Sequence, residues 1–486
     1  MIKNERQYQI TKAQAEKFAQ VLAQFAEHRE ENKQMHPLLQ QAQIDALQSQ
    51  LDDLHAQLEE YEALRSGRYS VIELDSFEEL PRILIQARIS SGLSQKELAE
   101  RLGLKEQQIQ RYEATEYASA SFERLKEVIA ALGIKVKEEV FLPHTQVSFS
   151  TLLKRLNKVG LDRDFVTKRL IPPFLLEHLL GDIGEEEVDT LVLRAASIVG
   201  RVFDWKPSLL FSATPLQVDA ATVGATRYKK AARTDERRVS AYTIYAHFLA
   251  LLVLEATSEL PKKPIPTEAS EVRRVILSTY GSLTFKNVLD YVWSLGVPIL
   301  SLNDPGAFHG ACWRVDGRNI IVLKQQTMSE ARWLFDILHE LRHIGEAPDQ
   351  NEFEVIESGE IAQKQRQSRE ERIASRFAGD VLLDGRSEEL VAQCIQAAKN
   401  SVERLKAVVP MIAEQENVPV DSLANYMAFR LSLQGLNWWG TANNLQVPNM
   451  APWQVARDFL LERANFDSLN EVDRNLLLQA LSSTED

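Results

Sequence analysis

Three prolines within residues 258–270 set the strongest limit on how this chain can fold. Pro261, Pro264 and Pro266 follow one another closely in that segment. Proline lacks a backbone donor and clashes with the preceding helical turn, so no regular helix continues through such a segment. The sequence therefore predicts a stiff linker and a domain boundary there. The 486 residues leave room for about three or four domains.

The composition is that of a globular protein with reduced thiols. Hydrophobic residues make up 44% of the chain and charged residues 26%, so real cores can form. Cys312 and Cys394 are too few for a disulfide framework or a cysteine-based zinc finger. The net charge of −13 argues against non-specific coating of nucleic acid, although it allows one local basic face. We find no apolar signal core in residues 1–10 and no membrane-length apolar run, and we expect a cytoplasmic protein.

Residues 1–70 are predicted to form a helical arm, with Pro37 between two helices. In the second helix, apolar side chains recur at alternating steps of three and four, the pattern of a coiled-coil seam. The residues of this seam are Ile44, Leu47, Leu51, Leu54, Leu58 and Tyr61. Two interpretations stay open, a helix packed on its own chain and a coiled coil that makes a homodimer.

Residues 75–140 are predicted to form a compact helical unit. Ser94 and Glu97 make a capping box at the start of one helix, Gly103 suits a tight turn, and Ala99 permits a close helix crossing. With the segments 92–99, 102–104 and 111–113, these residues make the region 78–134 resemble the helix-turn-helix domain of the XRE (Cro/repressor-like) family.

This resemblance implies sequence-specific binding to operator DNA. It implies that Gln95 contacts the phosphate backbone and that the next helix enters the major groove. The side chains presented there would be Lys105, Gln107, Gln108 and Arg111. Several acidic neighbours keep a protein-docking role open as the alternative. A dimer would match a palindromic operator.

Residues 148–260 and 386–486 are predicted to be helical, as a middle domain and a C-terminal region. The apolar segment 241–255 is expected to be a core helix. A basic stretch precedes it, and it is either a solvated helix face or a nucleic-acid contact. Its residues are Arg227, Lys229, Lys230, Arg233, Arg237 and Arg238.

The sequence His339-Glu340-Leu341-Arg342-His343 is an H-E-x-x-H motif. Residues four apart share a helix face, so both imidazoles can reach one Zn²⁺ at roughly 2.0–2.1 Å. Glu340 is then placed to take a proton from the attacking water. A catalytic zinc needs a third protein ligand, and spacing alone leaves several acids open. These acids are Glu346, Asp349, Glu352, Glu354, Glu370 and Glu371.

The segments around the motif carry a second resemblance. They are predicted helices at 271–280 and 284–295, a strand at 297–302, a hairpin 310–323 turned at Asp316-Gly317, and a helix at 328–346. Together with the segment 371–378, they make residues 271–385 resemble the ImmA/IrrE family of zinc metallopeptidases. The resemblance implies that Glu371 is the third ligand and that the fold is a small zincin-like α+β domain. Arg342 and Asp384 depart from the family pattern, and the change at Asp384 is expected to alter the substrate cleft.

The expected fold is therefore a multidomain, mainly helical protein with one small α+β peptidase domain. The family resemblance implies a bacterial regulator that cleaves a partner repressor or antitoxin-like protein in stress, mobile-element or phage-defence control. An extended substrate is expected to add as a strand to the edge of the 310–323 hairpin. The alternative is a non-proteolytic repressor or antitoxin in which the peptidase-like domain senses or scaffolds.

Overall fold

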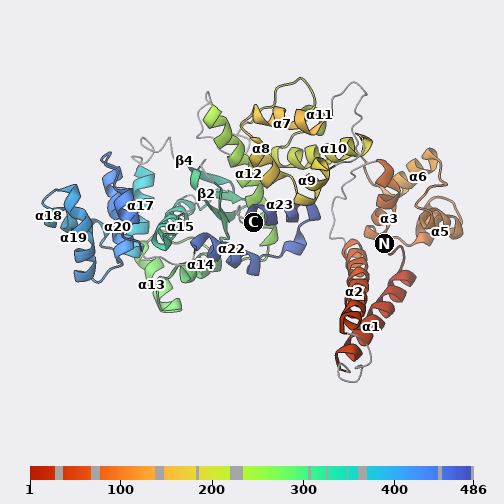
Figure 1. Ribbon diagram of the computed structural model, residues 1–486, viewed down its shortest axis with the longest axis horizontal. Coiled ribbons are helices and arrows are strands. Elements are labelled where there is room, and N and C mark those ends of the chain that lie inside the picture. The colour runs from red at the N-terminus through yellow and green to blue at the C-terminus, as the bar shows by residue number, and fades with distance from the viewer. Residues whose placement is uncertain are drawn as a thin grey trace. The chain divides into compact units, whose positions relative to one another are not determined.

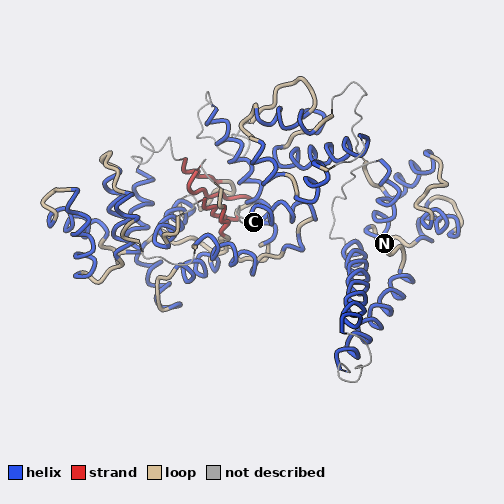
Figure 2. Tube along the Cα trace, in the orientation of Figure 1, coloured by secondary structure: helices blue, strands red, loops and turns tan. Residues whose placement is uncertain are grey.

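The computed structural model describes residues 1–27, 37–66, 77–136, 147–181, 185–218, 234–304, 308–324, 327–346, 348–358, 369–446 and 451–482. The chain divides into two compact units, Met1–Phe141 and Leu142–Asp486. Both are mainly helical, and the strands of the described part form one small sheet in the second unit (Figures 1 and 2). The predicted mainly helical fold with a small sheet is confirmed at this level.

The first unit contains a helical arm followed by a helix-turn-helix. Its elements are α1 (Glu5–Glu27), α2 (Pro37–Arg65), η1 (Phe77–Glu79), α3 (Leu80–Ser90), α4 (Gln95–Arg101), α5 (Glu106–Ala114) and α6 (Phe122–Leu132). Pro37 begins α2, because a proline is tolerated in a first turn, where its missing N–H needs no partner.

The predicted heptad seam of α2 faces α1 of the same chain. Tyr8 near the start of α1 stacks on Tyr61 near the end of α2, and Glu5 pairs with Arg65, so the two helices run antiparallel. Leu51 and Tyr61 of the seam are buried. The structure thus uses this seam within the chain, and the homodimer stays a prediction.

The second unit has one continuous apolar core that draws on segments from Leu152 to Leu481. Before the sheet lie α7 (Phe149–Asn157), α8 (Arg163–Phe165), η2 (Val166–Leu170), α9 (Pro173–Leu180), α10 (Glu185–Phe203), α11 (Pro207–Leu210), α12 (Thr234–Ala256), α13 (Ala269–Tyr280) and α14 (Phe285–Ser294). The remaining elements are β1 (Ile299–Leu302), β2 (Phe308–Val315), β3 (Arg318–Lys324), α15 (Glu330–Ile344), β4 (Phe353–Ser358), α17 (Arg369–Leu382), α18 (Ser387–Ala397), α19 (Val402–Gln415), α20 (Val420–Ser432), α21 (Trp439–Asn443), α22 (Pro452–Arg463), η4 (Phe466–Ser468) and α23 (Glu471–Leu481). The finer division of this unit at residues 260–271 and 386 stays a prediction.

The sheet has the strand order β1-β3-β2-β4. β1 is parallel to β3, whereas β2 is antiparallel to both β3 and β4. The β2–β3 hairpin is the predicted one, and its turn residues Asp316 and Gly317 have φ of 50° and 71°, as a tight hairpin turn requires. β4 was not predicted, and its presence corrects the expectation that a substrate strand adds to the edge of the 310–323 hairpin. Because β4 pairs with β2 and β1 pairs with β3, the hairpin has no free edge to which a substrate strand could add.

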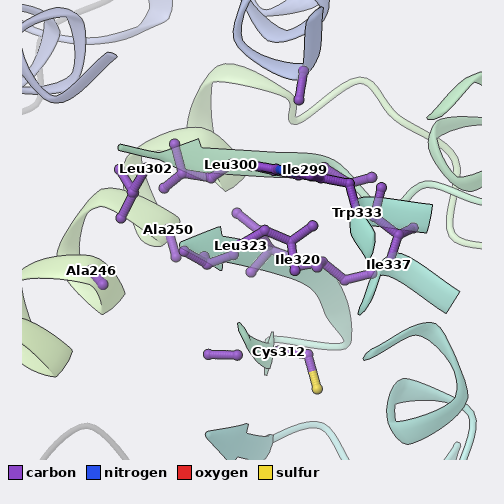
Figure 3. Packing of buried hydrophobic residues seen from close by; sticks show 14 of the residues in the cluster. Ala246, Ala250, Ile299, Leu300, Leu302, Cys312, Ile320, Leu323, Trp333 and Ile337 are labelled. Carbon is purple, nitrogen blue, oxygen red and sulfur yellow. The ribbon is translucent and has the colours of Figure 1, made fainter. Parts of the chain in front are cut away.

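Two helices cover opposite faces of this sheet. Consecutive strand residues point to opposite faces. Trp313 of β2 contacts His247 of α12, whereas its neighbour Cys312 interacts with Glu340 of α15. Figure 3 shows residues of both helices packed with strand residues in this core. One segment of α12, Arg237–Ala256, is long and apolar enough to cross a membrane, but 72% of its apolar window is buried inside the unit.

Arg314 fixes the end of α15 against the sheet. Its guanidinium donates to the backbone oxygen of Ile344 at 2.6 Å and to the side chain of Asn319 at 2.7 Å. The helix C-terminus has backbone carbonyls without helical partners, and a buried arginine satisfies one of them here. The last turn of α15, which carries His343, is therefore held to the β2–β3 hairpin.

Candidate metal centre and DNA-binding unit

Helix α15 places the H-E-x-x-H motif inside the second unit. Ser329 caps the helix by accepting from Arg332 N, and Glu330 in the first turn favours the helix dipole. His339, Glu340 and His343 are only 4%, 1% and 2% exposed. The motif therefore lies on a buried helix face and is not part of a solvated helix surface.

Three donor groups meet at one point. His339 Nε2 and His343 Nε2 are 3.0 Å apart. Glu371, near the start of α17, places Oε2 3.3 Å from His339 Nε2 and Oε1 3.6 Å from His343 Nε2. In the described part of the chain, this trio is the group of metal-ligating side chains that could hold an ion.

These separations fit a tetrahedral metal site. Ligand atoms at about 2.0–2.1 Å from a zinc ion, separated by the tetrahedral angle, lie about 3.3–3.4 Å from one another. The separation of 3.0 Å between the two histidine nitrogens lies near that value, as do the 3.3 and 3.6 Å from the histidines to the two different oxygens of Glu371. Two imidazoles and one carboxylate are also a ligand set of catalytic zinc sites, which keep a fourth position open. The residues present thus fit a zinc ion, although other divalent metals accept the same donors.

The charges around the trio hold it together. Burial alone would lower the pKa of His343, but the carboxylates of Glu346 and Glu371 outweigh it and raise this pKa to about 9. Burial would raise the pKa of Glu371, but its close contacts with the two histidines hold it far below the usual range. The Glu371 carboxylate and the protonated His343 imidazole therefore neutralise each other, and a bound metal cation would take the place of that proton.

Two further side chains contact the outer nitrogens of the histidines. Ser375 Oγ lies 3.2 Å from His339 Nδ1. Glu346 Oε2 lies 3.9 Å from His343 Nδ1, which is too long for a hydrogen bond and acts as a charge contact. Metal-binding histidines commonly donate their other N–H to such partners, which fix the ring and its tautomer.

Glu340 lies against strand β2 and takes no part in the trio. A Cβ on Gly310 would come within 2.4 Å of Glu340 Oε1, so any side chain at this position would force the buried carboxylate to shift. Two residues along the strand, Cys312 lies next to Glu340, and burial together with the charge of this carboxylate raises the pKa of the Cys312 thiol well above its usual value. Gly310 and Cys312 therefore share the strand face that lies over Glu340.

The competing acids and the two departures from the family pattern lie elsewhere. Glu352 accepts from Asp316 N at 3.1 Å, Asp349 and Glu370 are exposed, and the side chain of Glu354 is outside the described residues. Arg342 pairs with Glu346 at 3.4 Å. Asp384 pairs with Arg273 and follows the end of α17 opposite to Glu371. The expectation that Asp384 alters the substrate cleft stays a prediction.

The helix-turn-helix forms as the sequence predicts. Ser94 accepts from Glu97 N, and the Glu97 side chain accepts from Ser94 N, so the capping box is complete. Gly103 has a φ of 65°, as the turn between α4 and α5 requires. A buried ion pair between Arg88 and Glu113, with 2.5 Å between Nε and Oε1, ties α3 to α5.

The predicted DNA contacts fall into two groups. Lys105, Gln107 and Arg111 are exposed at the start and on the outer face of α5. Gln108 instead accepts from Lys105 N as part of the helix cap. Gln95 is 8% exposed and donates to Glu113 Oε2 at 2.7 Å, so its amide nitrogen is engaged inside the unit. Arg237 and Arg238 of the basic stretch are exposed, and the other four residues of that stretch lie outside the described part.

The fold of the first unit, and the exposed polar residues of α5, are those of a DNA-binding helix-turn-helix. Residues 84–138 match the family model described as helix-turn-helix (HTH_3). The match assigns DNA binding, in the manner of a transcription regulator, to this unit. No curated protein matches the chain, and no solved structure matches it. The ImmA/IrrE resemblance therefore stays a prediction from the residues quoted above.

The sequence analysis did not identify Ser375, Gly310 or Cys312 as residues of the site. A signal existed for Ser375, because it lies four residues after Glu371 and so shares its helix face. Gly310 and Cys312 had none, because their position over Glu340 depends on how the sheet packs on α15.

Proposed function

We propose that this chain is a cytoplasmic DNA-binding regulator whose second unit is a zinc-dependent endopeptidase that cuts a specific repressor or antitoxin-like partner protein. The observation that carries the proposal is the triangle of His339, His343 and Glu371, with Glu340 next to it and free of the ligand set. DNA binding by the first unit supports a role for such cleavage in transcription control, and the proposed settings are stress, mobile-element or phage-defence responses.

The division of labour follows from the positions of the side chains. Zinc supplies Lewis acidity and lowers the pKa of a nearby water. His339, His343 and Glu371 hold the ion. Glu340 takes the proton of the attacking water and passes it to the leaving amine. Strand β2, with Gly310 and Cys312 next to Glu340, shields this carboxylate from bulk water.

The burial of the site supports a narrow substrate range. The side chain of Glu371 is 15% exposed and those of the two histidines are 5% and 2% exposed. With ligand side chains this little exposed, a peptide carbonyl can contact the trio only after the protein around it rearranges. A specific partner or signal that opens the site would therefore control cleavage, and a general digestive activity is not expected.

The test uses the full chain, zinc and candidate partner proteins encoded beside it. Cleavage by the wild type, with loss of cleavage but retained zinc in Glu340→Gln, supports the proposal. Glu371→Gln should lose both zinc and cleavage. Glu370→Gln is the matched control, because this adjacent carboxylate is exposed and lies outside the trio. Cleavage that survives Glu340→Gln refutes the mechanism.

A second candidate is a non-proteolytic repressor or antitoxin in which the metal site senses or stabilises. The near-complete burial of Glu340, at 1% exposure, favours it. This candidate expects unchanged repression of a reporter promoter in Glu340→Gln and altered repression in Glu371→Gln. The peptidase proposal expects both variants to fail in relieving repression.

A further inference from the structure

An open groove lies within the first unit, between the start of the arm and the helix-turn-helix. Its volume is about 790 Å³. One wall is formed by residues 3–7 and 10 at the start of α1, and the opposite wall includes Glu106, Gln110 and Ala114 of α5. The groove therefore runs directly beside the helix that is expected to read DNA bases.

The start of the arm is fixed in this position. Ile2 is 3% exposed within the core of the unit. Lys3 Nζ donates to the backbone oxygen of Glu113 at 2.7 Å, and the Arg88 guanidinium donates to the backbone oxygen of Lys3 at 2.6 Å. Contacts to both α3 and α5 thus hold the first turn of α1 beside the groove.

Most of the cations that line the groove already have acidic partners. Its charged lining consists of four basic residues, Lys3, Arg6, Arg65 and Arg88, and two acidic residues, Glu5 and Glu106. Arg88 pairs with Glu113, Arg65 pairs with Glu5, and Lys3 lies 3.7 Å from Glu116. Arg6 is exposed and makes no ion pair with any residue that the structure describes in this unit.

The groove continues the DNA-facing surface of α5. Gln107 and Arg111 form one exposed stripe of this helix, and Glu106 and Gln110 form the next stripe, which lines the groove. When a recognition helix enters the major groove, the phosphate strands pass along its two sides. A phosphate strand on the side of Glu106 and Gln110 would meet the arm.

We propose that the first turn of α1 is a second DNA-contacting element and that Arg6 binds a backbone phosphate of the duplex read by α5. Arginine suits this role because its guanidinium forms paired, charge-assisted hydrogen bonds with phosphate oxygens. The contact adds affinity and fixes orientation but carries no sequence information. This inference rests on DNA binding by the helix-turn-helix and deepens it.

The experiment measures binding of the full chain to a fluorescein-labelled, mixed-sequence duplex by anisotropy over a series of salt concentrations. One phosphate contact changes log K by about 0.9 for each tenfold change in salt. Arg6→Ala should therefore weaken binding about eightfold at about 0.1 M salt relative to 1 M, and lower the salt slope by about 0.9. Arg6→Lys should keep most of the slope.

Lys17→Ala is the matched control, because Lys17 is an exposed cation on the same helix outside the groove. It should leave affinity and slope unchanged, and equal melting temperatures would show that both variants fold. If Arg6→Ala behaves like Lys17→Ala, the arm does not contact DNA and the inference is wrong. Tighter binding by Arg6→Ala would show that the arm obstructs DNA and would also overturn it. If the wild type binds no duplex, the DNA-binding assignment itself fails.

Discussion

Replacing Lys324 by methionine is expected to stabilise the second unit and to flatten its response to pH. Lys324 ends strand β3 and is 3% exposed. Its ammonium lies 3.7 Å from the ring centroid of Tyr242, and Asp304, paired with Arg169 at 2.7 Å, partly offsets the cost of its burial. Burial nevertheless lowers the pKa of Lys324 from 10.5 to about 7.

The sign and size of the effect follow from proton linkage. The unfolded chain holds the Lys324 proton up to about pH 10.5, whereas the folded unit releases it at about pH 7, so the free energy of unfolding rises with pH across that window. This residue contributes about 2 kcal/mol of that rise between about pH 7 and pH 9. At pH 7 the buried lysine costs on the order of 4 kcal/mol relative to a neutral side chain. Methionine has no such cost and keeps much of the apolar stem.

Urea unfolding at several pH values, followed by tryptophan fluorescence, measures this. All seven tryptophans lie between Trp205 and Trp453, so the signal reports the second unit. Lys324→Met should be the more stable protein at pH 7, and its advantage should shrink by about 2 kcal/mol toward pH 9. Lys406→Met, at an exposed position of α19, is the control and should run parallel to the wild type. Parallel curves for Lys324→Met as well would refute the reasoning.

Three further predictions concern the metal site and the DNA-reading helix. Ser375→Ala removes the partner of the first histidine ligand and should weaken zinc affinity about 10- to 100-fold in a chelator competition, whereas an unchanged affinity would exclude a positioning role. Gly310→Ala places a Cβ 2.4 Å from Glu340 and should destabilise the unit by about 1–3 kcal/mol in urea, while Gly440→Ala, with open space around it, should not. Arg111→Ala should cost about 1–3 kcal/mol in binding to a selected operator, and equal losses on selected and random duplexes would restrict it to phosphate contact.

The local patterns of the second unit could be predicted from sequence because each signal lies within a few neighbouring residues. The Asp316-Gly317 turn fixes its own hairpin, and the apolar spacing of residues 330–344 fixes the helix that carries the histidines. β4 was missed because Phe353–Ser358 is short and one third acidic, and its strand conformation depends on pairing with β2. Pairing across 40 residues leaves no local signature.

In the candidate site too, local sequence signals predict some residues, whereas others depend on long-range packing. His339 and His343 follow from helix geometry alone, because a spacing of four puts both rings on one face. Glu371 lies 28 residues beyond His343, and spacing left six acids open until the resemblance selected one. The structure brings this acid, among the described residues, to the two histidines. Gly310 and Cys312 lie over Glu340 only because the sheet packs on α15, so spacing in the sequence could not identify them.

The helix-turn-helix shows why polar residues at helix starts are poor guides to DNA contact. Ser94, Gln95 and Gln108 have the donors and acceptors that DNA would need, yet the fold uses all three. A helix start leaves backbone N–H groups without partners, and a buried carboxylate such as Glu113 needs donors, so nearby side chains satisfy those groups first. The side chains left for DNA are those that the cap and the core do not need. On α5 these are Gln107 and Arg111, and a surface this small makes the added charge of the arm more important for affinity.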